Sequence, residues 1–98
     1  MFDGLSIMTS FLAAFVHTDN GVTCSDSGFI DLSTAQECSG TVSYAESFNS
    51  EATYRGDVHK RSVPKGCYIA DWGSIHFNTH NSRGSSSLYT SICRKGNS

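Results

Sequence analysis

The sequence has few charged residues, a single proline and no internal repeat, and each of these shortages excludes a class of protein. Charged residues make up 16% of the chain, and 7 Lys and Arg stand against 9 Asp and Glu, so it lacks the positive field of a general nucleic-acid binder. Low charge combined with six Phe, four Tyr and one Trp excludes a disordered acidic or basic tail. One Pro without a repeat excludes collagen-like or proline-rich fibres.

Long hydrophobic runs are also missing. A bilayer span takes about 20 apolar residues, and the longest run, at positions 5–16 (LSIMTSFLAAFV), is too short. Its length suits the hydrophobic region of a secretory signal, but no Lys or Arg precedes it and no clear cleavage site follows. We therefore expect residues 1–18 to be either a signal-like segment or an apolar helix or strand that packs on the fold. Residues 19–98 are expected to form one disulfide-rich domain.

The four cysteines are the strongest signal that is present: Cys24, Cys38, Cys67 and Cys93, with no CxxC pair. Structural zinc sites usually need such a pair, so two disulfides are the better interpretation, and they predict a secreted or extracellular protein. Three pairings are possible, and we favour Cys24–Cys93 with Cys38–Cys67. The first bridge would clasp the ends of the domain and the second would tie a helix to a strand. Loop entropy assigns them about 4 and 3.5 kcal/mol, a large share of the roughly 5–15 kcal/mol of a typical domain.

The chain pattern predicts one helix, over residues 33–48. Ser33 can cap its N-terminus with Gln36 three positions later, and apolar residues then recur at steps of three and four. The preceding segment, 17–27, is rich in turn-forming residues and is expected to be a linker.

The second half of the chain predicts strands. Residues 49–65 are polar and are expected to form an irregular connector. Strand-forming residues follow at 66–70, 75–79 and 88–93, with a tight reversal at 71–73. The fold class is therefore expected to be α+β: one helix packed on a small, mainly antiparallel sheet, stapled by two disulfides.

Three stretches of this half, VPKGCY (63–68), IHFNTH (75–80) and SIC (91–93), form a pattern PxGCY…IxFN…IC. As a set they resemble a small four-cysteine module of secreted and surface proteins of microbial eukaryotes. Segment 30–45 is similar to the helical first half of that module. The resemblance implies a secreted or luminal disulfide domain and no catalytic activity.

The histidines are the candidate chemical groups. His76, Asn78 and His80 alternate along an expected strand, so they would share one face and could ligate Zn²⁺ or Cu²⁺ if a third ligand arrived from elsewhere. A solvated polar face is the simpler interpretation, and we expect no metal and no cofactor.

A basic cluster, His59-Lys60-Arg61 with Lys65, has two functional interpretations. It could attract an anionic ligand such as a sulfated glycan or a phosphate. Its histidine, together with His76 or His80, could also form the acid–base pair of a ribonuclease-like enzyme. A solvated loop is the interpretation that we favour, and nucleic acid is not an expected partner.

Aromatic residues point to binding. Trp72 is expected at the tip of a hairpin, where it could stack on a sugar or enter a partner's pocket, or else fold back over the sheet. We predict a non-enzymatic extracellular binding or adhesion module that recognises a glycan or a surface protein through Trp72, Tyr68 and the face of His76, Asn78 and His80. The alternatives are a small secreted His-dependent hydrolase, with His59, His76 and His80 as candidates, and a structural or toxin-like disulfide scaffold.

Overall fold

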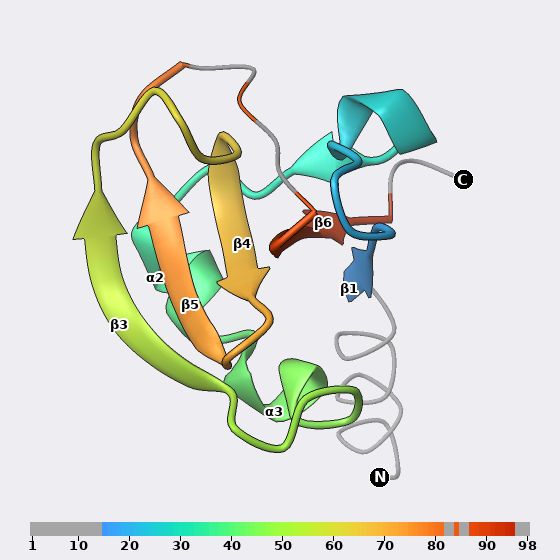
Figure 1. Cartoon of the computed structure of the whole chain (residues 1–98), viewed down its shortest axis with the longest axis vertical. Coiled ribbons are helices and arrows are strands. Elements are labelled where there is room, and N and C mark those ends of the chain that lie inside the picture. Colours follow the sequence, from blue (N-terminus) through green and yellow to red (C-terminus); the bar gives the residue numbers. More distant parts are fainter. Residues whose placement is uncertain (1–14, 82–83, 85–86, 96–98) are drawn as a thin grey trace, which may run out of the picture.

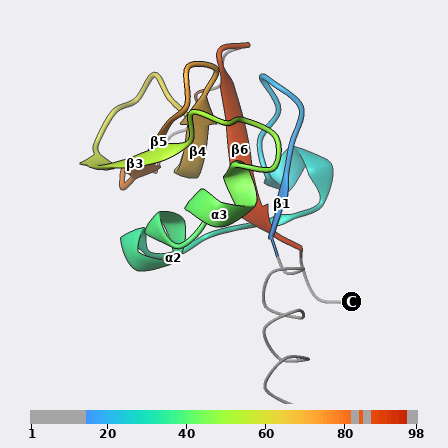
Figure 2. The same cartoon turned by 90° about the horizontal axis from the view of Figure 1, so that it is seen from below.

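The computed structural model describes residues 15–81, 84 and 87–95. Its elements follow in chain order: β1 (Phe15–His17), the 3-10 turn η1 (Ser25–Ser27), β2 (Ile30–Asp31), α2 (Ala35–Ser39), α3 (Val42–Ala45), β3 (Thr53–Val58), β4 (Gly66–Ala70), β5 (Ser74–Asn78) and β6 (Tyr89–Arg94). Figure 1 shows the strands as one curved layer, and Figure 2 shows α2 and α3 together on one side of it. The fold class is α+β, as the sequence predicts.

The strands are ordered β1-β6-β4-β5-β3, and β2 pairs separately with β6. Every pair is antiparallel except β3 with β5, which are parallel, so the sheet is mainly antiparallel. Strand β6 pairs with β4 through its first half and with both β1 and β2 through its second half. The sheet therefore divides between β2 and the start of β4.

The two disulfides are Cys24–Cys93 and Cys38–Cys67, which confirms the favoured pairing, and no cysteine is free. The second bridge ties α2 to β4. A cluster of almost fully buried side chains fills the space between the helices and the sheet: Leu32, Ile69, Ile75 and Ile92. Within the described residues, no helix has the length and apolar character needed to cross a membrane.

The expectation of a single helix over 33–48 is wrong, because two short helices stand there. Thr34 is the N-cap, and its hydroxyl accepts a hydrogen bond of 3.1 Å from the backbone N–H of Glu37. The Glu37 carboxylate in turn accepts from the backbone N–H of Ser33, so the paired cap lies one residue later than Ser33 with Gln36. The first helix ends at Ser39, and its C-cap is Gly40, a residue type that is about 1 kcal/mol worse than Ala inside a helix.

The expected irregular connector at 49–65 contains strand β3, so that expectation is also wrong. Half-buried and exposed residues alternate along Thr53–Val58, but Gly56 and several polar residues hide the pattern in the sequence. The linker expected at 17–27 likewise holds η1 and the end of β1. The apolar run at 5–16 lies mostly outside the described residues, and its last two residues belong to a strand, β1.

Candidate binding surfaces at the two ends of the sheet

The β4–β5 hairpin gives the sheet an aromatic face. Side chains alternate between the faces of a strand, and Cys67, joined to α2 by its disulfide, sets the helix face. Tyr68 must then point to the opposite face, together with His76, its partner across the antiparallel pair. Tyr89 lies opposite Ala70 and shares that face. The helices leave this side of the sheet uncovered (Figure 2).

Four rings on this face form a continuous series, which we call the aromatic row. The ring centroids of Trp72 and Tyr89 are 6.2 Å apart, those of Tyr89 and Tyr68 are 5.2 Å apart, and those of Tyr68 and His76 are 5.7 Å apart. The two tyrosines meet edge to face, an arrangement that aromatic pairs favour.

The members of the aromatic row differ in exposure. Trp72 is 59% exposed, whereas Tyr68 is 3% exposed and Tyr89 and His76 are half-buried. Burial, and then the neighbouring Tyr89, raise the pKa of Tyr68 to about 12, so its hydroxyl stays protonated near neutral pH. Tyr68 therefore supports the row from beneath, and Trp72 is the ring that a ligand can reach.

The turn that displays Trp72 is held by side chains from distant segments. The Asn49 amide nitrogen donates to the backbone carbonyl of Asp71 at 3.2 Å, and the Asn20 amide nitrogen donates to the Asp71 carboxylate at 2.8 Å. Asn20 is itself fixed, because its amide oxygen accepts from the hydroxyl of Thr90 at 3.2 Å. The exposed indole therefore stands on a rigid turn.

Gly73 completes this turn. Its φ of 100° lies in the left-handed region, and a Cβ added there would lie 2.5 Å from the carbonyl oxygen of Glu51. The Gly73 carbonyl also accepts a hydrogen bond of 2.9 Å from the backbone N–H of Thr53. The turn is thus seated directly on the segment that leads into β3.

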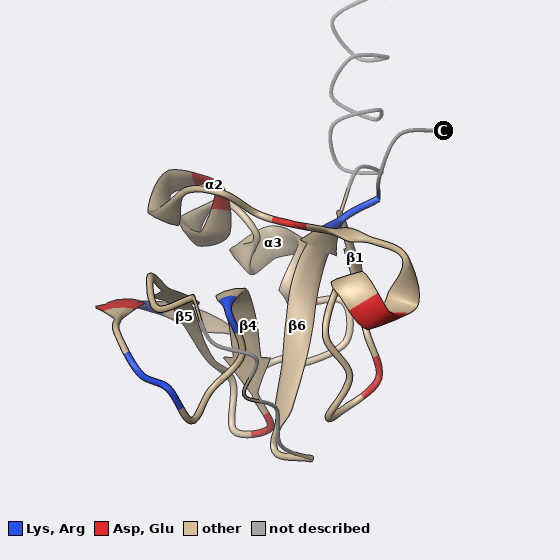
Figure 3. Cartoon of the chain, turned by 90° about the horizontal axis from the view of Figure 1, so that it is seen from above, with Lys and Arg blue, Asp and Glu red and all other residues tan. Residues whose placement is uncertain are grey.

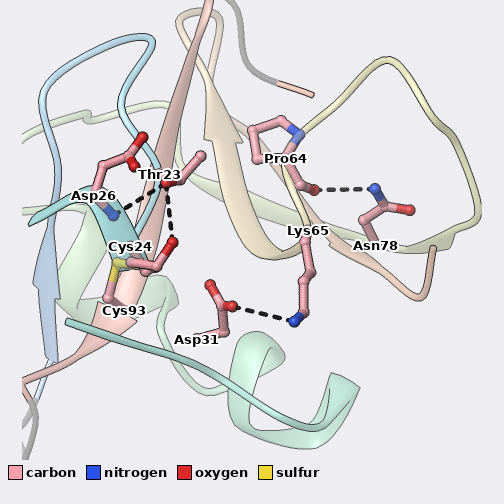
Figure 4. A network of polar contacts seen from close by, with 9 residues as sticks. Thr23, Cys24, Asp26, Asp31, Pro64, Lys65, Asn78 and Cys93 are labelled. Atoms are coloured by element: carbon pink, nitrogen blue, oxygen red, sulfur yellow. Dashed lines mark hydrogen bonds and ion pairs between the residues drawn. A yellow bond between two sulfur atoms is a disulfide. The ribbon is translucent and has the colours of Figure 1, made fainter. Parts of the chain in front are cut away.

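Asn78 organises the opposite end of the hairpin. It is 2% exposed, and its amide oxygen accepts from the backbone N–H groups of Lys60 and His80 at 3.0 and 3.2 Å. Its amide nitrogen lies 2.9, 3.2 and 3.0 Å from the carbonyl oxygens of Lys60, Val63 and Pro64; Figure 4 draws the contact with Pro64. Asn78 therefore fixes the loop at 60–64, and its amide is fully engaged within the protein.

The structure brings His59 and His80 together, with ring centroids 4.8 Å apart. The Nδ1 atom of His59 also lies 2.9 Å from the hydroxyl of Thr79. His76 lies elsewhere: its Nδ1 atom is 3.2 Å from the carbonyl oxygen of Gly56, and no contact in the described part of the chain joins it to either of the other two. Among residues 15–81, 84 and 87–95, no group of three His, Cys, Asp or Glu side chains could hold a metal ion.

A groove of about 620 Å³ lies where the sheet divides, between β2 and the open end of the β4–β5 hairpin. Ile30, Leu32 and Phe77 give it apolar walls, and His80 lies along it. The Nζ atom of Lys65 is 3.7 Å from the carboxylate of Asp31, so this ion pair joins the two walls (Figure 4). The groove therefore combines apolar surface with one ion pair and a histidine.

The predicted binding site leaves out two residues of the first surface, Tyr89 and Asn20. Tyr89 lies in the strand expected at 88–93, but which face it occupies depends on its register with Tyr68, which only the fold supplies. Asn20 lies in the turn-rich segment taken as a linker, and nothing near it in the sequence points to the distant Asp71.

Comparison with known proteins finds no match for this chain among family models, curated proteins or solved structures. The resemblance of the PxGCY…IxFN…IC pattern to a secreted four-cysteine module therefore stays a prediction. The two surfaces have to be interpreted from their own geometry.

Proposed function

We propose that the protein is a non-enzymatic extracellular binding module that recognises its ligand with Trp72 and the exposed end of the aromatic row. The observation behind this proposal is that an indole 59% exposed stands on a turn held by Asn20, Asn49 and a glycine that no other residue could replace without strain. Such an exposed ring adds little to folding, and it releases hydrophobic free energy when a ligand covers it. Because the turn is already ordered, binding requires little further ordering of the backbone.

The ligand class that this surface fits best is carbohydrate. A sugar ring offers a flat C–H face to an aromatic ring and hydroxyl groups to neighbouring polar atoms. Trp72 supplies the aromatic face, and Asp71, the preceding residue of the turn, supplies a carboxylate that the Asn20 amide holds in place. Among the described residues around this turn, the exposed large apolar side chains are Trp72 and the nearby Leu88, which suits a small sugar surface more than a broad protein interface.

Export is part of the proposal. All four cysteines are paired, and disulfides form and persist in oxidising compartments. The resemblance to a module of secreted and surface proteins supports the same location.

Binding is favoured over hydrolysis by the arrangement of the histidines. A ribonuclease-like acid and base act from two sides of the reacting phosphate. The rings of His59 and His80 are in contact, at 4.8 Å between centroids, which leaves no space for a phosphate between them. His76 is engaged with the Gly56 carbonyl on the aromatic face.

The sole tryptophan of the chain gives the experiment its signal. The protein is titrated with neutral oligosaccharides of glucose, galactose and N-acetylglucosamine while its fluorescence is recorded. We expect a saturable change with at least one of them, because a sugar stacked on Trp72 removes the indole from water. The Trp72→Ala variant, followed by calorimetry, should bind at least about tenfold more weakly, with its circular dichroism unchanged.

Phe48→Ala is the matched control, since Phe48 is a second aromatic ring, 37% exposed, that follows α3 on the helix side of the sheet. This variant should bind as the unmodified protein does, and Trp72→Phe should retain part of the affinity. A protein that gives no saturable signal with any of the three sugar series, or a Trp72→Ala variant of undiminished affinity, would show the proposal to be wrong.

A further inference from the structure

The exposed basic residues at the open end of the hairpin have no role in the proposed function. This group, which we call the basic loop, consists of His59, Lys60 and Arg61. The topology puts it at the other end of β5 from Trp72, and Figure 3 shows its Lys and Arg on a loop that projects from the sheet.

The basic loop is held in one conformation. Asn78 binds the Lys60 backbone through both its N–H and its carbonyl, at 3.0 and 2.9 Å, and it binds two more carbonyls farther along the loop. A buried asparagine that satisfies this many backbone groups is a rigid anchor. A ligand that contacts the basic loop therefore meets ordered backbone.

The positive charge of the basic loop is not balanced locally. In the described part of the chain, no carboxylate lies within ion-pair distance of Lys60 or Arg61. Asp57, the nearest acid along the chain, is bound to the hydroxyl of Tyr54 at 2.9 Å. Unpaired cations on an ordered loop attract anions, and arginine in particular matches the oxygens of sulfate and phosphate groups.

His80 connects the basic loop to the groove. Its ring touches that of His59, and it also lies along the groove beside Phe77 and Lys65. Its Nδ1 atom is buried and has no hydrogen-bond partner among the described residues. An unpartnered buried nitrogen is uncommon in folded proteins, and because the chain covers this atom, a ligand in the groove meets the rest of the imidazole ring.

From these observations we infer that the basic loop and the groove form a second binding site, which takes an ester of sulfate or phosphate. The oxyanion contacts Lys60, Arg61 and the imidazole of His80, and the organic part of the ester lies on the apolar wall at Phe77. This site is independent of the aromatic row.

Three matched probes test the inference: glucose, glucose 6-sulfate and glucose 6-phosphate, each titrated into isotope-labelled protein at low ionic strength while backbone amide resonances are recorded. We expect the amides of 59–61 and 79–81 to shift saturably with one or both esters and not with glucose. A response to the sulfate alone identifies a sulfated ligand, and a response to the phosphate alone identifies a phosphorylated one. Added salt should weaken binding, since the contact is ionic.

The double variant Lys60→Ala/Arg61→Ala should weaken ester binding about tenfold, and His80→Ala should weaken it by a smaller factor. Arg55→Ala/Lys95→Ala is the control, because it removes the same charge from exposed positions outside the site. Trp72→Ala should leave ester binding unchanged, so this result stands or falls separately from the proposed function. Absence of saturable shifts at 59–61 and 79–81, or equal weakening in the control, would overturn the inference.

Discussion

The two ends of the β4–β5 hairpin present different chemistry on equally ordered backbone. At the closed end, the turn at 71–73 exposes an indole beside the carboxylate of Asp71. At the open end, the loop at 60–64 exposes two cations and adjoins a groove. Both segments are held in place, because asparagine side chains hydrogen-bond to the backbone of each.

The two ends differ in how many side chains hold the exposed segment in place. At the closed end, the side chains of Asn20 and Asn49 and the backbone N–H of Thr53, which binds the Gly73 carbonyl, all hold the turn, and they come from separate parts of the chain. At the open end, a single buried residue, Asn78, binds most of the loop. A surface held by several weak contacts should tolerate the loss of one, whereas a surface held by one side chain should not.

Asn78→Ala should therefore have the largest effect. It leaves the backbone groups of Lys60, Val63, Pro64 and His80 without their partner in a largely buried place. We expect a loss of about 3 kcal/mol in the free energy of unfolding, measured by urea denaturation. Binding of the glucose esters should be lost as well, while sugar binding at Trp72 remains.

Asn49→Ala is the corresponding change at the closed end, where the side chain is half-buried and binds one carbonyl and one N–H group. It should cost only about 1 kcal/mol. If Asn78→Ala and Asn49→Ala lost the same free energy of unfolding, the two ends would not differ in how strongly they depend on a single side chain.

Gly73→Ala should have an intermediate effect, because it adds a Cβ where the Glu51 backbone already lies. The added Cβ would lie 2.5 Å from the Glu51 carbonyl oxygen, so the turn must move. We expect a loss of about 2 kcal/mol, together with weaker sugar binding as Trp72 shifts. Urea denaturation and the fluorescence titration measure the two effects.

Gly56→Ala separates backbone strain from the close contact. Gly56 has a similar φ, 111°, but nothing lies within 4 Å of an added Cβ. This variant should lose about 1 kcal/mol, the cost of the strained backbone alone. If it lost as much as Gly73→Ala, the overlap of the added Cβ with Glu51 would not contribute to the loss at Gly73.

The sequence predicts the features that depend on few residues close together or on covalent constraint. The fold class and the strands at 66–70 and 75–79 follow from strand-forming residues, and the four cysteines predict two disulfides. The sequence allows three pairings, and the favoured one is confirmed only by the structure. Strand β3 does not follow, since Gly56 and polar residues mask its alternation and its parallel pairing with β5 is a long-range event.

The same division applies to the sites. Trp72 can be placed at a hairpin tip from its neighbours Asp71 and Gly73, and its 59% exposure agrees with that position. The burial of Asn78 cannot be predicted from the sequence. Alternation along the strand predicts an outward side chain, and the loop that covers Asn78 has no regular pattern. His80 was expected to share a face with His76, but it lies beyond the end of β5 and contacts His59 instead.

The smallest expected effect concerns alkaline pH and the buried base of the aromatic row. The pKa of Tyr68 is raised from 10.0 to about 12 by burial and then by Tyr89, so the folded chain holds this proton more tightly than the unfolded chain. The stabilisation is complete below the unfolded value and is lost as pH rises from about 10 to about 12. The free energy of unfolding should fall over that range, and it should fall less in Tyr68→Phe, which has no proton to lose there.

Tyr54, which lies outside the aromatic row, provides the comparison for this last effect. Burial, and then the hydrogen bond to Asp57 and its negative charge, raise the pKa of Tyr54 to about 12 as well. Tyr54→Phe should therefore reduce the alkaline loss of stability to a similar extent, but only Tyr68→Phe acts directly beneath the ligand surface. If sugar binding measured across this pH range changed equally in both variants, Tyr68 would not be supporting Trp72 through Tyr89.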